Sequence, residues 1–164
     1  MENKLTVTDF WQNTIDNFND ENQCGFCWNF FAPLTEVQLN LIRNQDECCV
    51  NVFLVRNKGV DFDTQFSTAT GVSALELERE IYDVYFLIKS KEGINNYNEM
   101  ADHPISESRE KTIFEPLRKC ITHKLINEIC KTFLVTQWQG NYIYDYQDEQ
   151  YYGIKLSITT QRYI

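Results

Sequence analysis

One stretch near the middle of the chain, "ALELEREIYDVYFLIK" at residues 74–89, limits the possible folds more than any other. In its first half, apolar and charged residues alternate, which is typical of a strand with one exposed face. Its second half is apolar at both parities, which is typical of a central strand covered on both faces. We therefore predict one long strand here. A helix beginning at Ser73 is the competing interpretation of the first half.

A second strand pattern occupies the end of the sequence, "YYGIKLSITTQRYI". Large apolar side chains recur there at every second position: Tyr152, Ile154, Leu156 and Ile158. Together with the preceding stretch "FLVTQWQGNYIYDY", this pattern predicts a C-terminal β-hairpin with its turn near residues 147–149. A long exposed strand edge is an aggregation hazard that natural proteins usually block. We therefore expect a neighbouring subunit to cover the terminal strand.

An apolar stripe with a spacing of four residues marks the main helix, which we expect to end near Lys131. The stripe consists of Ile113, Leu117, Ile121, Leu125 and Ile129, widened by Phe114 and Ile126. Pro116 leaves two possible starts. Either the helix begins at Ser106 and kinks at the proline, or it begins near Thr112 and holds the proline in its first turn.

Two shorter patterns lie near the beginning of the chain. Residues 8–18 predict a short amphipathic helix with Thr8 or Asp9 as its N-cap. The stretch "CGFCWNFFAPL", residues 24–34, is interpreted as a strand with three aromatic rings on one face. These rings are Phe26, Trp28 and Phe30.

The remaining segments complete an α+β domain that spans residues 1–164. Residues 48–55 predict a strand, followed by a turn at Asn57 to Gly59. Residues 37–47 are ambiguous, and a strand that turns at its end is the favoured interpretation, whereas residues 60–70 are interpreted as a loop. We expect a largely antiparallel β-sheet with the long amphipathic helix packed on one face, a short N-terminal helix and the C-terminal β-hairpin.

The acidic composition bears on the partners that this chain can have. Its formal net charge is −9 and its pI is near 4.7, whereas tight phosphate binding needs clustered lysines and arginines. The opening "MENKLTVTDFWQN" has no signal-peptide pattern, and no apolar run approaches the length of a membrane span. We therefore expect no membrane association and a reducing compartment, in which the six cysteines are free thiols.

The sequence holds no recognisable catalytic motif, P-loop or dinucleotide-binding fingerprint. Cys24 and Cys27 have the C-x-x-C spacing of zinc and redox sites. Within the predicted strand, however, residues three apart point to opposite faces and cannot share one metal ion. His103 and His123 have no nucleophile or carboxylate at a recognisable spacing. We therefore expect no catalytic residue, no metal site and no cofactor.

Tyrosines gather around the predicted terminal turn. Tyrosine is enriched at protein interfaces because it combines a large apolar area with a hydroxyl group. The predicted interface consists of these tyrosines and of the apolar residues of the terminal strand: Tyr142, Tyr144, Tyr146, Tyr151, Tyr152, Ile154, Leu156 and Ile158. A tyrosine-bearing sheet face without a partner is the alternative interpretation.

The order of these predicted elements resembles that of the tail terminator, tail-completion and head-to-tail joining proteins of tailed bacteriophages. An N-terminal helix leads to a strand and then to a hairpin whose long second arm ends in "IYDVYFLI". A polar loop, one long helix and a terminal hairpin follow. Asn and Ile are common and Ala is scarce, which indicates an AT-rich genome and would suit a crAss-like phage.

The resemblance implies a homo-oligomeric ring around the DNA channel in the neck or tail of the virion, built from chains made in the host cytoplasm. The partners would then be other copies of the chain and neighbouring neck or tail proteins. The resemblance implies no enzymatic activity and no specific nucleic-acid binding, since DNA would only pass through the lumen. A small monomeric protein-binding module, such as an anti-host inhibitor, is the alternative, and an enzyme with a deep pocket is a further one.

The acidic charge predicts that such a ring would not bind the DNA in its channel. Many copies of a chain with net charge −9 repel phosphate, so that the duplex stays free to slide. Acidic side chains from the loop after Lys89 or from residues 145–149 would then face the channel; the alternative is that acidity only maintains solubility. We expect no gel shift of duplex DNA by the isolated protein at low salt, where electrostatic attraction is strongest. Sub-micromolar binding would contradict this prediction.

Overall fold

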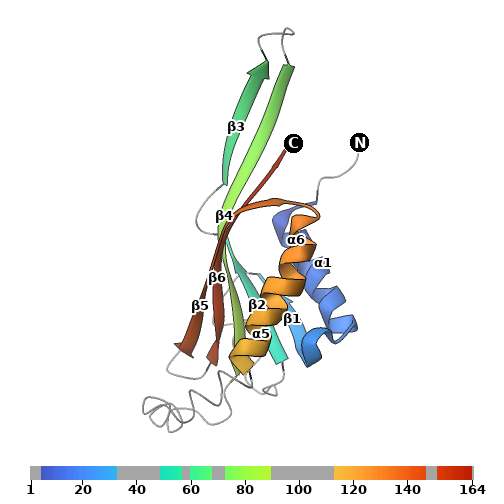
Figure 1. The fold of residues 1–164 in the computed structure, drawn as a ribbon, viewed down its shortest axis with the longest axis vertical. Coiled ribbons are helices and arrows are strands. Elements are labelled where there is room, and N and C mark those ends of the chain that lie inside the picture. Colours follow the sequence, from blue (N-terminus) through green and yellow to red (C-terminus); the bar gives the residue numbers. More distant parts are fainter. Residues whose placement is uncertain are drawn as a thin grey trace.

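The computed structural model describes residues 5–32, 49–56, 60–67, 73–89, 113–146 and 151–163. Their helices and strands are α1 (Val7–Asp20), β1 (Cys27–Phe31), β2 (Cys49–Val55), β3 (Val60–Ser67), β4 (Ser73–Lys89), α5 (Glu115–Cys120), α6 (Ile126–Cys130), β5 (Leu134–Tyr146) and β6 (Tyr151–Tyr163). Within this part of the chain, six strands form one mixed, mostly antiparallel sheet. Figure 1 shows the helices on one face of the sheet. The predicted α+β fold is therefore confirmed.

β4 is the strand that joins the sheet together. It is 17 residues long, and one of its edges pairs antiparallel with β6. Its other edge pairs antiparallel with β3 over residues 73–80 and with β2 over residues 83–87. The predicted long strand is confirmed, and the alternative helix at Ser73 is wrong. The loop predicted at residues 60–70 is also wrong over residues 60–67, because β4 extends past β2 and pairs there with β3.

β6 is a central strand and not the exposed edge that we expected at the end of the sequence. One of its edges pairs with β4 and the other with β5, both in antiparallel orientation. The predicted C-terminal hairpin is confirmed, and its turn lies outside the described residues. β4 of the same chain covers the edge for which we expected a neighbouring subunit. The strands at the two ends of the order are β1, which pairs parallel with β2, and β5.

α1 begins before its predicted cap. Thr6 has extended backbone angles, and its Oγ1 accepts a hydrogen bond from Asp9 N at 3.0 Å. The two predicted caps, Thr8 and Asp9, therefore lie inside the first turn. The predicted amphipathic helix is confirmed, and its buried side carries Phe10, Trp11, Ile15 and Phe18. The Trp11 indole donates a hydrogen bond to the Tyr82 hydroxyl at 3.0 Å, so that both polar atoms are satisfied inside the core.

α5 and α6 form one continuous helix, joined by a π-helical segment at Ile121–Leu125. The predicted apolar stripe is buried, and its innermost members are at most 2% exposed: Phe114, Leu117, Ile121, Leu125 and Ile129. Pro116 lies in the first turn of α5, where its missing N–H costs little. Residues 106–112, which decide between the two predicted starts, are outside the description. No helix in the described part of the chain is long and apolar enough to cross a membrane.

The predicted strands at residues 24–34 and 48–55 are confirmed as β1 and β2, although β1 is shorter than predicted. Trp28 is 1% exposed, and Phe26 and Phe30 pack against the core beside it. The three rings therefore share one face, as expected. The other local predictions lie outside the described residues: the strand at 37–47, the turn at 57–59 and the polar loop after Lys89.

Ile121 provides a test of the buried helix face. It is 2% exposed, so Ile121→Leu, which conserves side-chain volume, should lower the free energy of unfolding by less than about 1.5 kcal/mol. Ile121→Asp buries an unpaired charge and should abolish soluble folding. Urea unfolding and soluble yield measure these effects, with Thr122→Asp at the exposed neighbouring position as the control. An Ile121→Asp variant as stable as the parent would show that the buried face is wrongly assigned.

Candidate functional site

The hairpin formed by β3 and the first half of β4 extends beyond the helix layer (Figure 1), and we call it the arm (residues 60–67 and 73–80). The register of β4 with β6 begins at Leu77. Among the described strands, residues 73–76 therefore pair with β3 alone. The outer part of the arm is thus a two-stranded ribbon that continues from the edge of the main sheet.

The arm exposes two apolar side chains, since Phe62 is 76% exposed and Val60 is 49% exposed. In the register, Phe62 lies opposite Glu78, and residues of equal parity along β4 share one face of the sheet. That face is covered by the helices at Tyr82 and beyond, but the described helices do not reach the arm (Figure 1). We call the four residues Val60, Phe62, Glu76 and Glu78 the arm face.

An ion pair fixes the base of the arm to the helix layer. Glu80 is 4% exposed and accepts a hydrogen bond from the Arg56 guanidinium, which also donates to Thr8 Oγ1 at 3.1 Å. Burial raises the pKa of Glu80, and the charge of Arg56 opposes this rise only in part. The buried carboxylate therefore depends on Arg56 for its charged form, and the contact with Thr8 joins the sheet to α1.

A second arginine holds the base of the arm from the side of β6. Arg162 Nη2 lies 3.6 Å from Glu78 Oε1, and its Nη1 donates a hydrogen bond to the backbone carbonyl of Leu5. Its guanidinium carbon is 5.0 Å from the centre of the Phe133 ring, a cation–π distance. The base of the arm is thus tied to the residues before α1 and to the residues that lead into β5.

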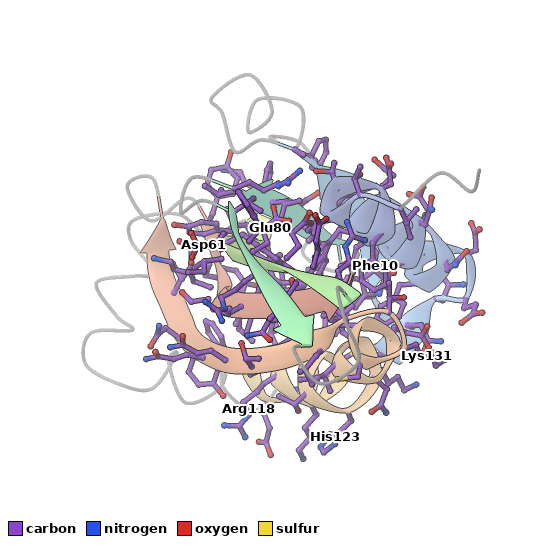
Figure 2. The ribbon with its side chains drawn as sticks, turned by 90° about the horizontal axis from the view of Figure 1, so that it is seen from above. Phe10, Asp61, Glu80, Arg118, His123 and Lys131 are labelled. Atoms are coloured by element: carbon purple, nitrogen blue, oxygen red, sulfur yellow. A yellow bond between two sulfur atoms is a disulfide. The ribbon has the colours of Figure 1, made fainter. Side chains whose placement is uncertain are left out.

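A groove of about 590 Å³ lies between α1 and α6. Its lining is mostly polar and includes two lysines and two glutamates: Thr14, Asn17, Phe18, Glu21, Gln23, His123, Lys124, Asn127, Glu128 and Lys131. In Figure 2, the side chains of His123 and Lys131 point away from the sheet, on the outer side of the helix layer. The groove therefore carries charges of both signs on the outside of the helices, and the Phe18 ring in its lining is only 4% exposed.

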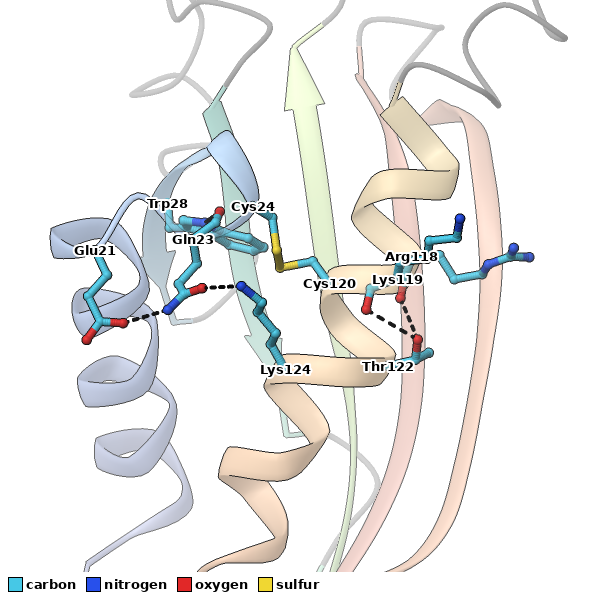
Figure 3. Close-up of a disulfide and its surroundings, with 9 residues drawn as sticks. All are labelled: Glu21, Gln23, Cys24, Trp28, Arg118, Lys119, Cys120, Thr122 and Lys124. Carbon is cyan, nitrogen blue, oxygen red and sulfur yellow. Dashed lines mark hydrogen bonds between the residues drawn. A yellow bond between two sulfur atoms is a disulfide. The ribbon is translucent and has the colours of Figure 1, made fainter.

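Gln23 connects the two sides of this groove (Figure 3). Its Oε1 accepts a hydrogen bond from Lys124 Nζ at 2.9 Å, and its Nε2 donates to Glu21 Oε2 at 2.6 Å. Lys131 forms an ion pair with Glu128 at 2.8 Å. Lys124, in contrast, contacts a neutral amide, so its positive charge is not neutralised by this contact.

A disulfide between Cys24 and Cys120 fixes the turn that leads from α1 into β1 (Figure 3). The two Cα atoms are 6.2 Å apart, within the range that a disulfide requires. Asn22 and Cys24 have φ angles of 49° and 58°, so the backbone turns here and does not extend. The prediction of free thiols is therefore wrong for these two cysteines. The predicted strand also begins too early, because the turn is what allows Cys24 to face α5.

Three other cysteines in the described residues are not part of a disulfide: Cys27, Cys49 and Cys130. Cys27 and Cys49 occupy paired positions of β1 and β2, and the Asn29 amide nitrogen lies 3.9 Å from the Cys27 sulfur. Within the described ranges, no group of three His, Cys, Asp or Glu side chains is placed to hold a metal ion. Cys48 and His103 lie outside these ranges.

Most of the predicted interface residues lie inside the chain. Five of them are at most 4% exposed: Tyr151, Tyr152, Ile154, Leu156 and Ile158. They are buried because β6 is central in the sheet and packs on both faces. Tyr142 is half-buried, with its ring 4.9 Å from that of Phe114. Tyr144 and Tyr146 belong to β5, and their side chains are outside the description.

The arm differs from the loop predicted at residues 60–70, although the sequence contains a signal for its first strand. The stretch "VDFD", residues 60–63, alternates apolar and acidic positions, which is typical of a strand with one polar face. This pattern could have predicted β3. The exposure of Phe62 could not be predicted from it, because alternation indicates which residues share a face but not whether that face is covered.

Arg56→Gln tests the ion pair at the base of the arm. Glu80 then stays buried without its cation, and we expect the free energy of unfolding to fall by about 2 kcal/mol at pH 7. This is less than for a fully buried pair, because the Arg56 side chain is 40% exposed. Burial raises the pKa of Glu80 above 4.5 in the folded parent, and the loss of Arg56 raises this pKa further in the folded variant. The deficit is therefore complete above the pKa of the folded variant. It disappears as the pH falls to the pKa of the folded parent and below.

Urea unfolding at pH 7 and at pH 5 measures this effect. The control is the double variant Arg56→Gln with Glu80→Gln, which carries no buried charge at either pH. Its deficit relative to the parent should change less between the two pH values than that of the single variant. A single variant as stable as the parent at pH 7 would show that Arg56 does not support the buried carboxylate.

Comparison with known proteins adds no family to these observations. No family model matches the sequence, and no curated protein matches it either. What the site can do therefore follows from its own features. These are an anchored arm that exposes an aromatic ring and a polar groove between two helices that is lined by charges of both signs.

Proposed function

We propose that this chain is a structural subunit of a homo-oligomeric ring in the neck or tail of a tailed bacteriophage, without an enzymatic role. The observation that carries the proposal is the arm, which extends beyond the helix layer and leaves Phe62 76% exposed. Exposed apolar side chains that gather on a projecting element are typical of surfaces that bind another protein. The arm is therefore suited to contact with a neighbouring subunit.

Burial of the arm face against a neighbour would stabilise an assembly. Full burial of a phenylalanine side chain contributes about 1.5–3 kcal/mol, and a ring repeats the contact in every subunit. Each chain would insert its own arm into one neighbour and receive an arm from the other. Such a contact joins two different surfaces, and contacts of this kind close into rings when the rotation between copies permits.

The anchoring of the arm supports a permanent contact. Arg56 and Arg162 tie its base to the helix layer and to neighbouring strands, so the arm face has one orientation before it binds. An element ordered in advance loses less conformational entropy on association than a flexible one. In this proposal the arm takes the place that we first gave to the terminal strand.

The order of the elements supports the placement in a phage particle. A helix, two strands, a hairpin with a long second strand, a long helix and a terminal hairpin follow each other along the described part of the chain. Apart from the additional strand before the hairpin, this is the order on which the resemblance to neck and tail ring proteins rests. The partners are then other copies of the chain and neighbouring virion proteins. A net charge of −9 suits a lumen through which DNA passes without being bound.

Size-exclusion chromatography with light scattering tests the proposal on the full chain. We expect a discrete oligomer whose mass is a multiple of 19.5 kDa. Phe62→Ser removes the exposed ring and should weaken association by about tenfold to a hundredfold. Leu134→Ser is the matched control, because Leu134 is 64% exposed but lies outside the arm.

A parent protein that is monomeric at micromolar concentration would contradict the ring and favour the monomeric protein-binding module. Equal dissociation of the Phe62→Ser and Leu134→Ser variants would contradict the role of the arm. An oligomer that is lost in Phe62→Ser and retained in Leu134→Ser is the expected result.

A further inference from the structure

The outer edge of β5 is a surface that can pair with another strand. Among the described strands, β5 pairs with β6 on one edge, and its other edge lies at the side of the sheet (Figure 1). A strand at the end of a sheet presents its backbone N–H and C=O groups to a further strand. We propose that this edge pairs antiparallel with the β5 edge of a second copy of this chain, about a twofold axis at Gly140. The contact goes beyond the ring proposed above, because it does not use the arm.

The part of β5 that is suited to this contact runs from Gln137 to Ile143. Its register with β6 is regular over these residues and shifts at both of their ends. Irregularities of this kind bend a strand and interrupt its pairing. The contact is therefore limited to residues 137–143, and Leu134 lies outside it.

Gly140, at the centre of this segment, has no conformational reason to be glycine. Its φ angle is not positive, and the register is regular at this position. A Cβ atom built there would make ordinary contacts, because the three nearest atoms belong to β6 and lie 3.9 Å away. A glycine that weakens the interior of a strand without forming a bulge often marks the close approach of another backbone. Gly140 is exposed, and this exposed surface is backbone because glycine has no side chain.

Residues at equal distances from Gly140 are chemically alike, and this makes a second copy the partner that fits. In an antiparallel pair centred on Gly140, Trp138 lies opposite Tyr142 and Gln139 lies opposite Asn141, and each pair occurs twice. The two aromatic rings pack against the main core, so the rings of both copies meet on the helix side of the sheet. Aromatic cross-strand pairs stabilise sheets and cover glycines at their edges. The two amides are exposed and can both donate and accept hydrogen bonds.

This edge also lacks the charges that would keep two copies apart. The whole chain carries a net charge of −9, yet β5 has no charged residue from Leu134 to Tyr144. Natural proteins protect edge strands with charged side chains, especially lysine. The edge strand β3 carries Asp61 and Asp63, so pairing with its own copy would gather like charges. β1 has only five residues, which leaves β5 as the described edge best suited to pair with its own copy.

A twofold contact uses the same surface of both partners and therefore joins only two copies. The arm contact proposed above joins two different surfaces and continues around a ring. Together, the two contacts would pair one ring with a second ring through β5. Either contact can form without the other, so that each can be tested by itself.

Gly140→Cys tests the position of the twofold axis. The two introduced thiols would lie directly opposite each other, with their Cα atoms about 4.5–5.5 Å apart, a separation that a disulfide bridges. We expect oxidised glutathione to link the full chain into dimers, and peptide mass spectrometry to find residue 140 joined to residue 140. Gln137→Cys is the matched control, because this position is exposed on the same strand but lies about 20 Å from its counterpart in this register. It should remain unlinked.

Two double variants test the paired amides. Gln139→Lys with Asn141→Lys brings like charges together at both pairs, so we expect the Kd of the β5 contact to rise by about tenfold at low salt. Gln139→Lys with Asn141→Glu changes the same positions but pairs opposite charges, and it should associate like the parent. Phe62→Ser is the background for both, because it weakens the arm contact and leaves β5 unchanged. Light scattering should show this background as a dimer of twice 19.5 kDa.

Three results would overturn the contact at β5: a monomeric Phe62→Ser protein, a Gly140→Cys protein that links no faster than Gln137→Cys, or equal association of the two double variants. If the parent still assembles, any of these results leaves the ring standing. A parent that forms only dimers, with residue 140 joined to residue 140 in Gly140→Cys, would contradict the ring and support the β5 contact.

Discussion

The pairing of β4 on both of its edges is the constraint on which the remaining structure depends. β6 pairs with one edge of this 17-residue strand, and β2 and β3 pair in turn with the other. The other two strands of the described sheet, β1 and β5, pair with β2 and β6. Because buried backbone N–H and C=O groups need hydrogen-bond partners, the position of every strand follows from its place relative to β4.

The arm follows from a difference in length between β4 and the helices. A strand rises about 3.3 Å per residue and a helix about 1.5 Å. The 17 residues of β4 therefore extend about 56 Å, whereas the 16-residue helix that packs on the sheet extends about 24 Å. The helices can cover only part of β4, and the uncovered part is the arm with Phe62 on its face. The ion pair of Arg56 and Glu80 lies where the covered part ends.

The groove depends on contacts between segments that are far apart along the chain. Cys24 and Cys120 are separated by 96 residues, and Gln23 and Lys124 by 101. These contacts hold the turn after α1 against the long helix, so that Phe18 and Lys124 line one groove. The local sequence patterns predict a strand at Cys24 and a helix at Lys124, and nothing in either pattern indicates that the two segments meet.

The sequence by itself determined the elements whose side chains repeat with a clear period. The long strand at residues 74–89, the helix stripe around Ile121 and the terminal hairpin were predicted correctly, because the spacing of apolar residues reports local backbone geometry. Only the tertiary structure decided that β6 is central, that Cys24 pairs with Cys120 and that Phe62 is exposed. Each of these depends on which distant segment covers a given edge or face, and a periodic pattern carries no information about the partner that covers it.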